Sequence, residues 1–275
     1  MSYISTRDDT KLYVKDWGIG RPVILLHGWP LSADSWDDSA MALADAGFRA
    51  IAYDRRGFGR SDQPWNGYEY DTLADDLAAV IEHVGANDVA VVGFSMGGGE
   101  VARYMSRHGG KHVAQAALIS SVVPYMLKTA DNPHGADLAV FDQMTVGMKE
   151  DRAHFFASFF KAFFGAGVLS SLVSSEVLEW ARGTAMQASL KATLACAKAF
   201  ATTDFRGDLA AFTVPTLIIH GTDDKTVPID AAGRAAAHGI PHAKLIEYDG
   251  APHGLFATHK ERLTTDLITF LKSTH

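Results

Sequence analysis

One stretch of the sequence decides the fold: Val89-Ala90-Val91-Val92-Gly93-Phe94-Ser95-Met96-Gly97-Gly98-Gly99. Its first half is a β-branched, apolar run of the kind found in buried strands. Its second half predicts a helix from Gly98 to about Arg107. Between the two, the pattern Gly-x-Ser-x-Gly predicts a turn so sharp that Ser95 takes a positive φ, which strains any residue other than glycine. Side chains at positions 93 and 97 would clash with nearby backbone, so both positions require glycine.

The same pattern is that of a nucleophile elbow. Strain at the turn lifts the Ser95 hydroxyl clear of the sheet edge. The helix that follows directs free N–H groups and its positive dipole end toward the same place. The alternative is a strand, a glycine turn and a helix without chemistry, and the pentapeptide alone leaves that alternative open.

Strand and helix patterns alternate on both sides of this stretch. Strands are expected at residues 3–6, 12–17, 22–26, 48–53, 113–119, 214–219 and 243–248. Helices are expected at residues 35–47, 72–84 and 260–271, the second of them with Asp71 as its N-cap. Strands separated by helices imply an α/β fold with a mostly parallel sheet and right-handed crossovers.

The alternation stops between about residues 124 and 205, where the sequence is mostly helical. We interpret this segment as an insertion. The expected organisation is a core formed by residues 1–123 and 206–275, with residues 124–205 as a helical cap.

Composition limits the classes of function. The chain has 275 residues, is 47% hydrophobic and carries a net charge of −7, which argues against nucleic acid as a partner. Its one cysteine, Cys196, excludes an intrachain disulfide. No signal-peptide pattern opens the sequence, and no apolar run approaches the roughly 20 residues of a membrane span. We therefore expect a cytoplasmic protein that does not bind a membrane.

Two loops late in the sequence can activate a serine. A serine hydroxyl needs an adjacent base that is itself oriented by a third group. Asp223 and Asp224 follow one predicted strand, and His253 follows the next. In an open parallel sheet such loops meet at the carboxyl ends of the strands. The chain order Ser, Asp, His is the one expected of an α/β-hydrolase elbow.

Five motifs now carry a family resemblance: His27-Gly28-Trp29-Pro30, Tyr53-Asp54-Arg55-Arg56-Gly57-Phe58-Gly59, Gly93-Phe94-Ser95-Met96-Gly97, Asp224 within residues 221–228, and Ala251-Pro252-His253-Gly254. The chain resembles the α/β-hydrolase superfamily. More closely, it is similar to the cofactor-free bacterial haloperoxidases and their arylesterase, perhydrolase and γ-lactamase relatives. The resemblance implies the α/β-hydrolase fold, a mostly parallel central sheet flanked by helices with an inserted helical cap. It implies no cofactor and no metal.

The resemblance also implies roles for single residues. Ser95 would be the nucleophile, His253 the general base and then acid, and Asp224 the residue that orients His253. Asp223 remains the alternative to Asp224. The oxyanion hole would be formed by the backbone N–H groups of Trp29 and Met96.

Several other residues have competing interpretations. Members of the phenylalanine stripe between Phe155 and Phe164 are expected to pack the cap onto the body. The candidates for an apolar pocket lining are Pro30, Met126, Met144, Phe159, Phe160 and Trp180. Structural roles are expected for His27, His220 and the charged loop from Asp54, and a buried, inert thiol for Cys196. A metal site at His108 and His112 is disfavoured because no third ligand is evident.

The expected activity is that of a serine esterase on small carboxylic esters, with perhydrolase activity that makes a peracid from a carboxylic acid and hydrogen peroxide. Such a peracid would give non-haem chloroperoxidase or bromoperoxidase activity. A lactonase or amidase on the same triad is the alternative, and a ligand-binding protein without turnover is the alternative of another class. The expected partners are therefore small molecules, with a homo-oligomer as a further possibility that the relatives suggest.

Overall fold

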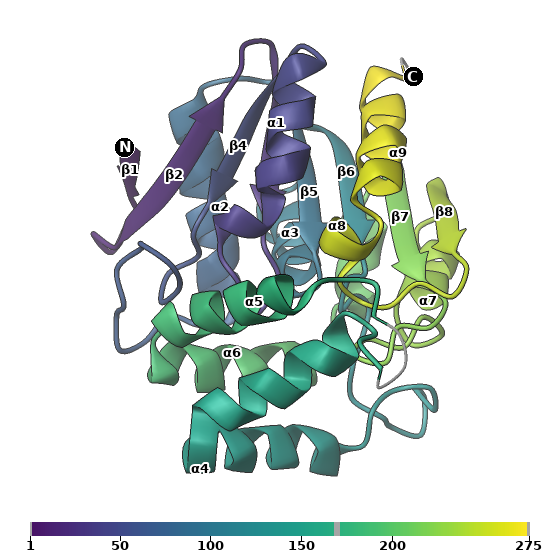
Figure 1. Cartoon of the computed structure of the whole chain (residues 1–275). Helices are drawn as coiled ribbons and strands as arrows, with labels where there is room; N and C mark the ends of the chain where they lie inside the picture. The colour runs from purple at the N-terminus through teal and green to yellow at the C-terminus, as the bar shows by residue number, and fades with distance from the viewer. Residues whose placement is uncertain (1, 168–170, 274–275) are drawn as a thin grey trace.

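The computed structural model describes residues 2–167 and 171–273. Its centre is one eight-stranded sheet in the order β1-β2-β4-β3-β5-β6-β7-β8 (Figure 1). The strands are β1 (Ser2–Ser5), β2 (Lys11–Trp17), β3 (Arg21–Leu26), β4 (Phe48–Tyr53), β5 (Val89–Phe94), β6 (Val113–Ile119), β7 (Thr216–Gly221) and β8 (Ala243–Tyr248). β2 pairs antiparallel with both β1 and β4, and strands β3 to β8 run parallel to one another. The predicted α/β fold class with a mostly parallel sheet is confirmed.

Helices cover both faces of this sheet. Figure 1 shows α1 (Asp37–Asp45) and α9 (Lys260–Lys272) on one face, with α2 (Tyr70–Val84) and α3 (Met96–Arg107) on the other. Every residue of β5 is buried, as its continuous apolar sequence requires of a strand covered on both sides. The core therefore lies on both faces of β5, and the residues that follow β5 emerge at the end of a fully buried strand.

The turn after β5 has the predicted geometry. Ser95 has φ 54° and lies between the last residue of β5 and the first residue of α3. A Cβ on Gly93 would lie 2.5 Å from the carbonyl oxygen of Gly97, and one on Gly97 would lie 2.6 Å from that of Leu26. Both distances are too short for non-bonded atoms, so the two glycines are required by the close approach of β3, β5 and α3.

Three helices lie between β6 and β7 in sequence: α4 (Leu138–Phe163), α5 (Ser175–Gln187) and α6 (Leu190–Thr202). They lie together across the end of the sheet toward which the parallel strands run (Figure 1). α4 is interrupted at Asp151, whose φ of −151° is not helical. The Asp151 carboxylate accepts a hydrogen bond from the backbone N–H of His154, which caps the second half of α4. Residues 1, 168–170 and 274–275, which the expected core and cap ranges include, lie outside the described residues.

The beginning of α2 corrects one prediction. The helix starts at Tyr70 with Glu69 at the N-cap position, so Asp71 is not the N-cap. Asp71 lies in the first turn, and its carboxylate pairs with the guanidinium of Arg103 on α3. The Asp71 carboxylate is therefore engaged in an ion pair between two adjacent helices instead of capping α2. The spacing of residues in the sequence does not reveal this pair.

Short helical segments outside the main pattern were not predicted. They are η1 (Ala33–Trp36), η2 (Arg206–Ala211), α7 (Gly233–Gly239) and α8 (Leu255–Thr258). Each is too short to give a periodic apolar pattern. Within residues 2–167 and 171–273, no helix has the length and apolar character needed to cross a membrane.

Candidate active site

Three side chains from separate loops meet at the carboxyl end of the sheet. Ser95 follows β5, Asp224 lies in the loop after β7, and His253 lies in the loop after β8. His253 Nε2 lies 2.9 Å from Ser95 Oγ, and His253 Nδ1 lies 2.6 Å from Asp224 Oδ2. All three residues are buried. The structure therefore joins the residues of the predicted triad in one continuous hydrogen-bonded chain.

The partners fix where the protons lie. An ionised carboxylate only accepts hydrogen bonds, so His253 Nδ1 must donate to Asp224. In the neutral ring, Nε2 is then unprotonated and accepts the hydrogen bond of the Ser95 hydroxyl. This is the tautomer in which His253 can remove the Ser95 proton.

Asp224 is held in its ionised form. Its Oδ1 accepts the backbone N–H groups of Thr226 at 2.9 Å and Val227 at 2.7 Å. Burial alone would raise the pKa of this carboxyl, but the positive charge of the protonated His253 ring and the hydrogen bonds from His220 and His253 outweigh it and hold the pKa below its usual range. The alternative acid, Asp223, instead pairs with Lys225 at an exposed position.

The structure brings both residues of the predicted oxyanion hole next to Ser95. Met96 is the first residue of α3, so its N–H has no partner within the helix. Trp29 follows Gly28 in the loop after β3, and a Cβ on Gly28 would lie 3.0 Å from the Ser95 Cβ. The loop can approach Ser95 so closely because residue 28 is glycine. Trp29 and Ser95 also line the same cavity.

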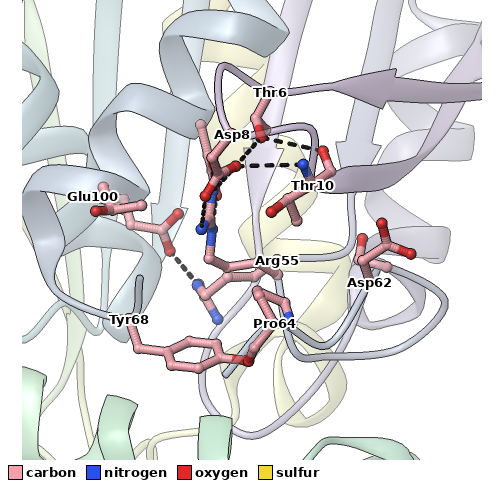
Figure 2. Close-up of polar contacts among 12 residues, drawn as sticks. Thr6, Asp8, Thr10, Arg55, Asp62, Pro64, Tyr68 and Glu100 are labelled. Carbon is pink, nitrogen blue, oxygen red and sulfur yellow. Dashed lines mark hydrogen bonds and ion pairs between the residues drawn. The ribbon is translucent and has the colours of Figure 1, made fainter. Parts of the chain in front are cut away.

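A buried ion pair supports the loop that carries Trp29. Arg55 Nε donates to Glu100 Oε1 at 2.6 Å, and the same guanidinium donates through Nη2 to the carbonyl oxygen of His27 at 2.5 Å. Figure 2 shows Arg55 and Glu100 facing each other beside α3. His27 in turn accepts the backbone N–H of Arg55 at 3.0 Å, and burial together with the Arg55 charge lowers its pKa well below the ordinary value. His27 is thus a neutral residue of the loop framework.

The charged loop after β4 forms the ion network expected of it. Arg56 pairs with Asp76 on α2 and with Asp8 in the β1–β2 turn. Figure 2 shows Thr6 and Thr10 in contact with Asp8. Asp54 accepts the backbone N–H of Ala33 at 2.8 Å and pairs with Arg60. These contacts tie the loops after β3 and β4 to the body.

The triad opens onto a cavity of about 350 Å³ between the body and the helices α4 and α6. Its lining is mostly apolar and consists of Trp29, Ser95, Val122, Met126, Ala136, Val140, Phe141, Met144, Phe159, Ala162, Phe200, Lys225, Thr226, Val227 and Pro228. A pocket of this size and character suits a small apolar ligand whose reactive group reaches Ser95.

The lining candidates divide into two groups. Met126, Met144 and Phe159 border the cavity. Pro30, Phe160 and Trp180 do not border it, which corrects that prediction for these three. Phe160 is fully buried among other aromatic rings of α4. Trp180 of α5 is 37% exposed and packs against Phe256 of α8. Helical periodicity marks an apolar stripe but does not say which of its members borders a cavity rather than a packed interface.

The phenylalanine stripe packs the helical segment, which comprises α4, α5 and α6, against the active site. Phe163 places its ring 4.7 Å from the His253 imidazole between centroids, in an edge-to-face arrangement. Phe164 lies against Gly254, where a Cβ would approach its ring to 2.4 Å. The expected packing of this stripe onto the body is therefore present, and it excludes water from the histidine side of the site.

Other side chains that sequence alone left ambiguous have structural surroundings. His108 pairs with Asp75, and the described residues contain no group of three His, Cys, Asp or Glu side chains arranged to hold a metal ion. Cys196 is buried, and burial raises the pKa of its thiol to about 12 despite the opposing charge of Arg55. This thiol is inert at neutral pH.

Sequence analysis missed part of the lining. Val140 and Phe141 lie four and three residues before the predicted Met144, which places all three on one side of the first half of α4. That spacing was available in the sequence. Val227 and Pro228 come from the Asp224 loop, and no local pattern shows that this loop curls back to the cavity.

Comparisons with known proteins agree with this geometry. The alpha/beta hydrolase fold family matches residues 21–260. A non-heme chloroperoxidase from Kitasatospora aureofaciens is 42% identical over 98% of this chain and 99% of its own length. The bifunctional esterase/perhydrolase of Acinetobacter calcoaceticus is 42% identical over 99% of this chain and 100% of its own. The crystal structure of a bromoperoxidase from Bacillus anthracis has a TM-score of 0.95 and 45% identity, covering 99% of this chain and 100% of that one.

Proposed function

Because the chain belongs to the alpha/beta hydrolase family, we propose that it is a serine hydrolase acting on small carboxylic esters through an acyl-enzyme, with perhydrolase activity. The observation that carries the proposal is the Ser95–His253–Asp224 chain of hydrogen bonds at the base of an apolar cavity. The esterase/perhydrolase relative supports acyl transfer as the reaction, and the triad supports Ser95 as its nucleophile.

Acylation uses the three side chains in turn. Ser95 Oγ attacks the ester carbonyl carbon while its proton passes to His253 Nε2. The carbonyl electrons move onto the oxygen, which the N–H groups of Trp29 and Met96 stabilise. When the tetrahedral intermediate collapses, the alkoxide leaves and takes the proton from His253 as an alcohol. Asp224 stabilises the imidazolium that exists between these two transfers.

Deacylation repeats the sequence with a second nucleophile. Water gives the carboxylic acid and restores Ser95. Hydrogen peroxide gives the peracid instead, since its oxygen forms the new bond to the acyl carbon and its proton passes through His253 to Ser95. With a carboxylic acid as the acyl donor, acylation releases water. A peracid that leaves the site can then transfer one oxygen to chloride or bromide, giving hypohalous acid and the carboxylate.

The same proposal covers the division of the chain into a body and a cap, its partners and its location. Residues 1–123 and 206–275 would form the catalytic body, and residues 124–205 the cap that selects the acyl and alcohol groups. The cavity supports small molecules as partners rather than nucleic acid. A cytoplasmic location and a homo-oligomeric state belong to the same proposal.

The test is hydrolysis of p-nitrophenyl acetate by the wild type and by Ser95→Ala, with peracid formation from acetate and hydrogen peroxide measured on the same samples. We expect both activities in the wild type and the loss of both in the variant. Ser95-dependent hydrolysis without peracid would remove the perhydrolase part, and lactones and amides would be assayed next. A wild type inert toward the ester and toward an activated phosphonate would overturn the assignment as an enzyme of this kind.

A further inference from the structure

A second histidine contacts the carboxylate of Asp224. His220 lies next to the end of β7, four residues before Asp224, and its side chain is completely buried. Its Nε2 lies 3.3 Å from Asp224 Oδ2 and 2.9 Å from the carbonyl oxygen of Val227. The sequence predicted only a structural residue at the end of a strand. Its contact with Asp224 indicates a more specific role.

The Val227 carbonyl determines the protonation of His220. A carbonyl oxygen accepts hydrogen bonds and never donates them, so His220 Nε2 must carry a proton. That proton lies between two acceptors, Val227 O and Asp224 Oδ2. His220 therefore closes the loop between residues 220 and 227 and at the same time donates weakly to the carboxylate.

One carboxylate oxygen is thus shared by two histidines. Asp224 Oδ2 accepts from His253 Nδ1 at 2.6 Å and faces His220 Nε2 at 3.3 Å. A donor on a carboxylate oxygen withdraws negative charge, which weakens the attraction of that oxygen for the imidazolium of His253. Removing this donor should therefore stabilise the protonated form of His253.

The surroundings keep the His220 ring in one position. A Cβ on Gly233 of α7 would lie 2.9 Å from His220 Nδ1, so only a glycine leaves room for the ring there. Within the described residues, Nδ1 has no hydrogen-bond partner. The ring is accordingly oriented by its Nε2 contacts and by close packing.

The other charged groups near the pair are already matched. Glu247 of β8 lies opposite His220 in the strand register and pairs with Arg234 of α7, which also pairs with Asp230. The rings that face His253 on its other sides belong to Phe94 and Phe163, which carry no charge. Among the described residues, the carboxylate in contact with His253 is that of Asp224, and His220 contacts the same carboxylate.

We propose that His220 is a positioning residue of the triad, which holds the Asp224 loop through Val227 and limits how strongly Asp224 binds the protonated His253. This inference rests on the proposed function only for its kinetic consequence. The effect of His220 on the protonation of His253 can be measured even in a protein that turns over no substrate.

The experiment compares His220→Leu with His220→Gln. Leucine removes the donor, whereas the glutamine amide nitrogen reaches about the position of Nε2 and can donate to Val227. The pKa of His253 is measured by NMR titration of isotopically labelled ring atoms, and kcat and KM are measured for p-nitrophenyl acetate. Thermal unfolding of both variants shows whether the fold is kept.

With leucine we expect the pKa of His253 to rise by roughly half a unit or more. We also expect kcat to fall by roughly tenfold to a hundredfold with little change in KM, because His220 does not border the cavity. With glutamine, the pKa of His253 and kcat should both return most of the way to the wild-type values. If leucine prevents folding, His220→Asn replaces it, since its shorter amide cannot reach Val227.

An unchanged pKa of His253 in the variant without the donor would overturn the proposal, even if kcat fell, because packing alone would explain that fall. Failure of glutamine to restore the pKa would overturn it as well. A wild type inert toward esters would refute the proposed function, while the titration would still decide the role of His220.

Discussion

The body around Ser95 and the helical segment above it are specified by different kinds of interaction. In the body, directional contacts fix each group: Ser95 by its forced φ, His253 by two hydrogen bonds, and Arg55 by its bonds to Glu100 and His27. In α4 and α6 the groups that border the cavity are held by ring and aliphatic packing. Small changes in the body should therefore be costly, and changes in the helical segment should alter selectivity instead.

The largest effect is expected from Asp224→Asn. The N–H groups of Thr226 and Val227 hold the amide oxygen at the Oδ1 position, so the amide nitrogen faces His253 Nδ1 and donates to it. His253 then loses the tautomer that accepts the Ser95 proton. We expect kcat for p-nitrophenyl acetate to fall by about 10⁴-fold. Asp223→Asn is the matched control, and its kcat should stay within about twofold because Asp223 contacts Lys225 and not His253. Similar losses in both variants would contradict the assignment of Asp224.

The next prediction compares stability after the loss of one ion pair in the body and one in the helical segment. Glu100→Gln leaves Arg55 buried without a matching charge, and we expect the free energy of unfolding to fall by about 3–5 kcal/mol in urea titrations. Glu179→Gln removes the exposed partner of Arg182 on α5, where the two groups lie 3.6 Å apart. Its effect should stay within about 0.5 kcal/mol. Equal losses would show that the body is not the more tightly specified region.

The same contrast explains what the sequence could predict. The Gly93-x-Ser95-x-Gly97 turn follows from sterics within five residues, and the order of Ser95, Asp224 and His253 follows from the rule that loops gather at the carboxyl ends of parallel strands. These features are readable because short-range geometry or topology determines them. The contact of Glu100 with Arg55 was missed, although a glutamate on an otherwise small and apolar side of a helix after the elbow is a usable signal.

The errors lie where long-range packing decides. Phe159 and Phe160 are adjacent in one aromatic stripe, yet only Phe159 borders the cavity. Trp180 is a pocket candidate from its place in the helical segment, but it lies against Phe256 instead. Asp71 is predicted as an N-cap, but it lies in the first turn of α2, where Arg103 of the neighbouring helix pairs with its carboxylate. In each case the deciding partner lies on another element, whose position the local pattern does not contain.

A smaller effect on activity tests the selectivity of the helical segment. Phe159→Ala enlarges the cavity, so we expect kcat/KM for a bulky acyl ester to rise relative to the acetate ester by roughly tenfold. Trp180→Ala is the control from the same segment and should leave this ratio within about twofold, because Trp180 does not border the cavity. Competition between the two esters in one reaction measures the ratio directly. An equal change in both variants would mean that the cavity lining does not set acyl preference.

The smallest effect uses two glycines at which a Cβ would meet no neighbouring atom, Gly85 after α2 and Gly183 within α5. Gly183→Ala should stabilise the protein by about 0.5–1 kcal/mol, because alanine favours a helix interior over glycine. Gly85→Ala should destabilise it by about 1 kcal/mol, because residue 85 has a φ of +70° that a Cβ disfavours. Urea titration of both variants gives the two signs. Opposite signs from equally open positions would show that backbone conformation and not space decides the cost. If both variants were stabilised, the left-handed conformation of residue 85 would not require glycine. The body would then tolerate this substitution as well as the helical segment does.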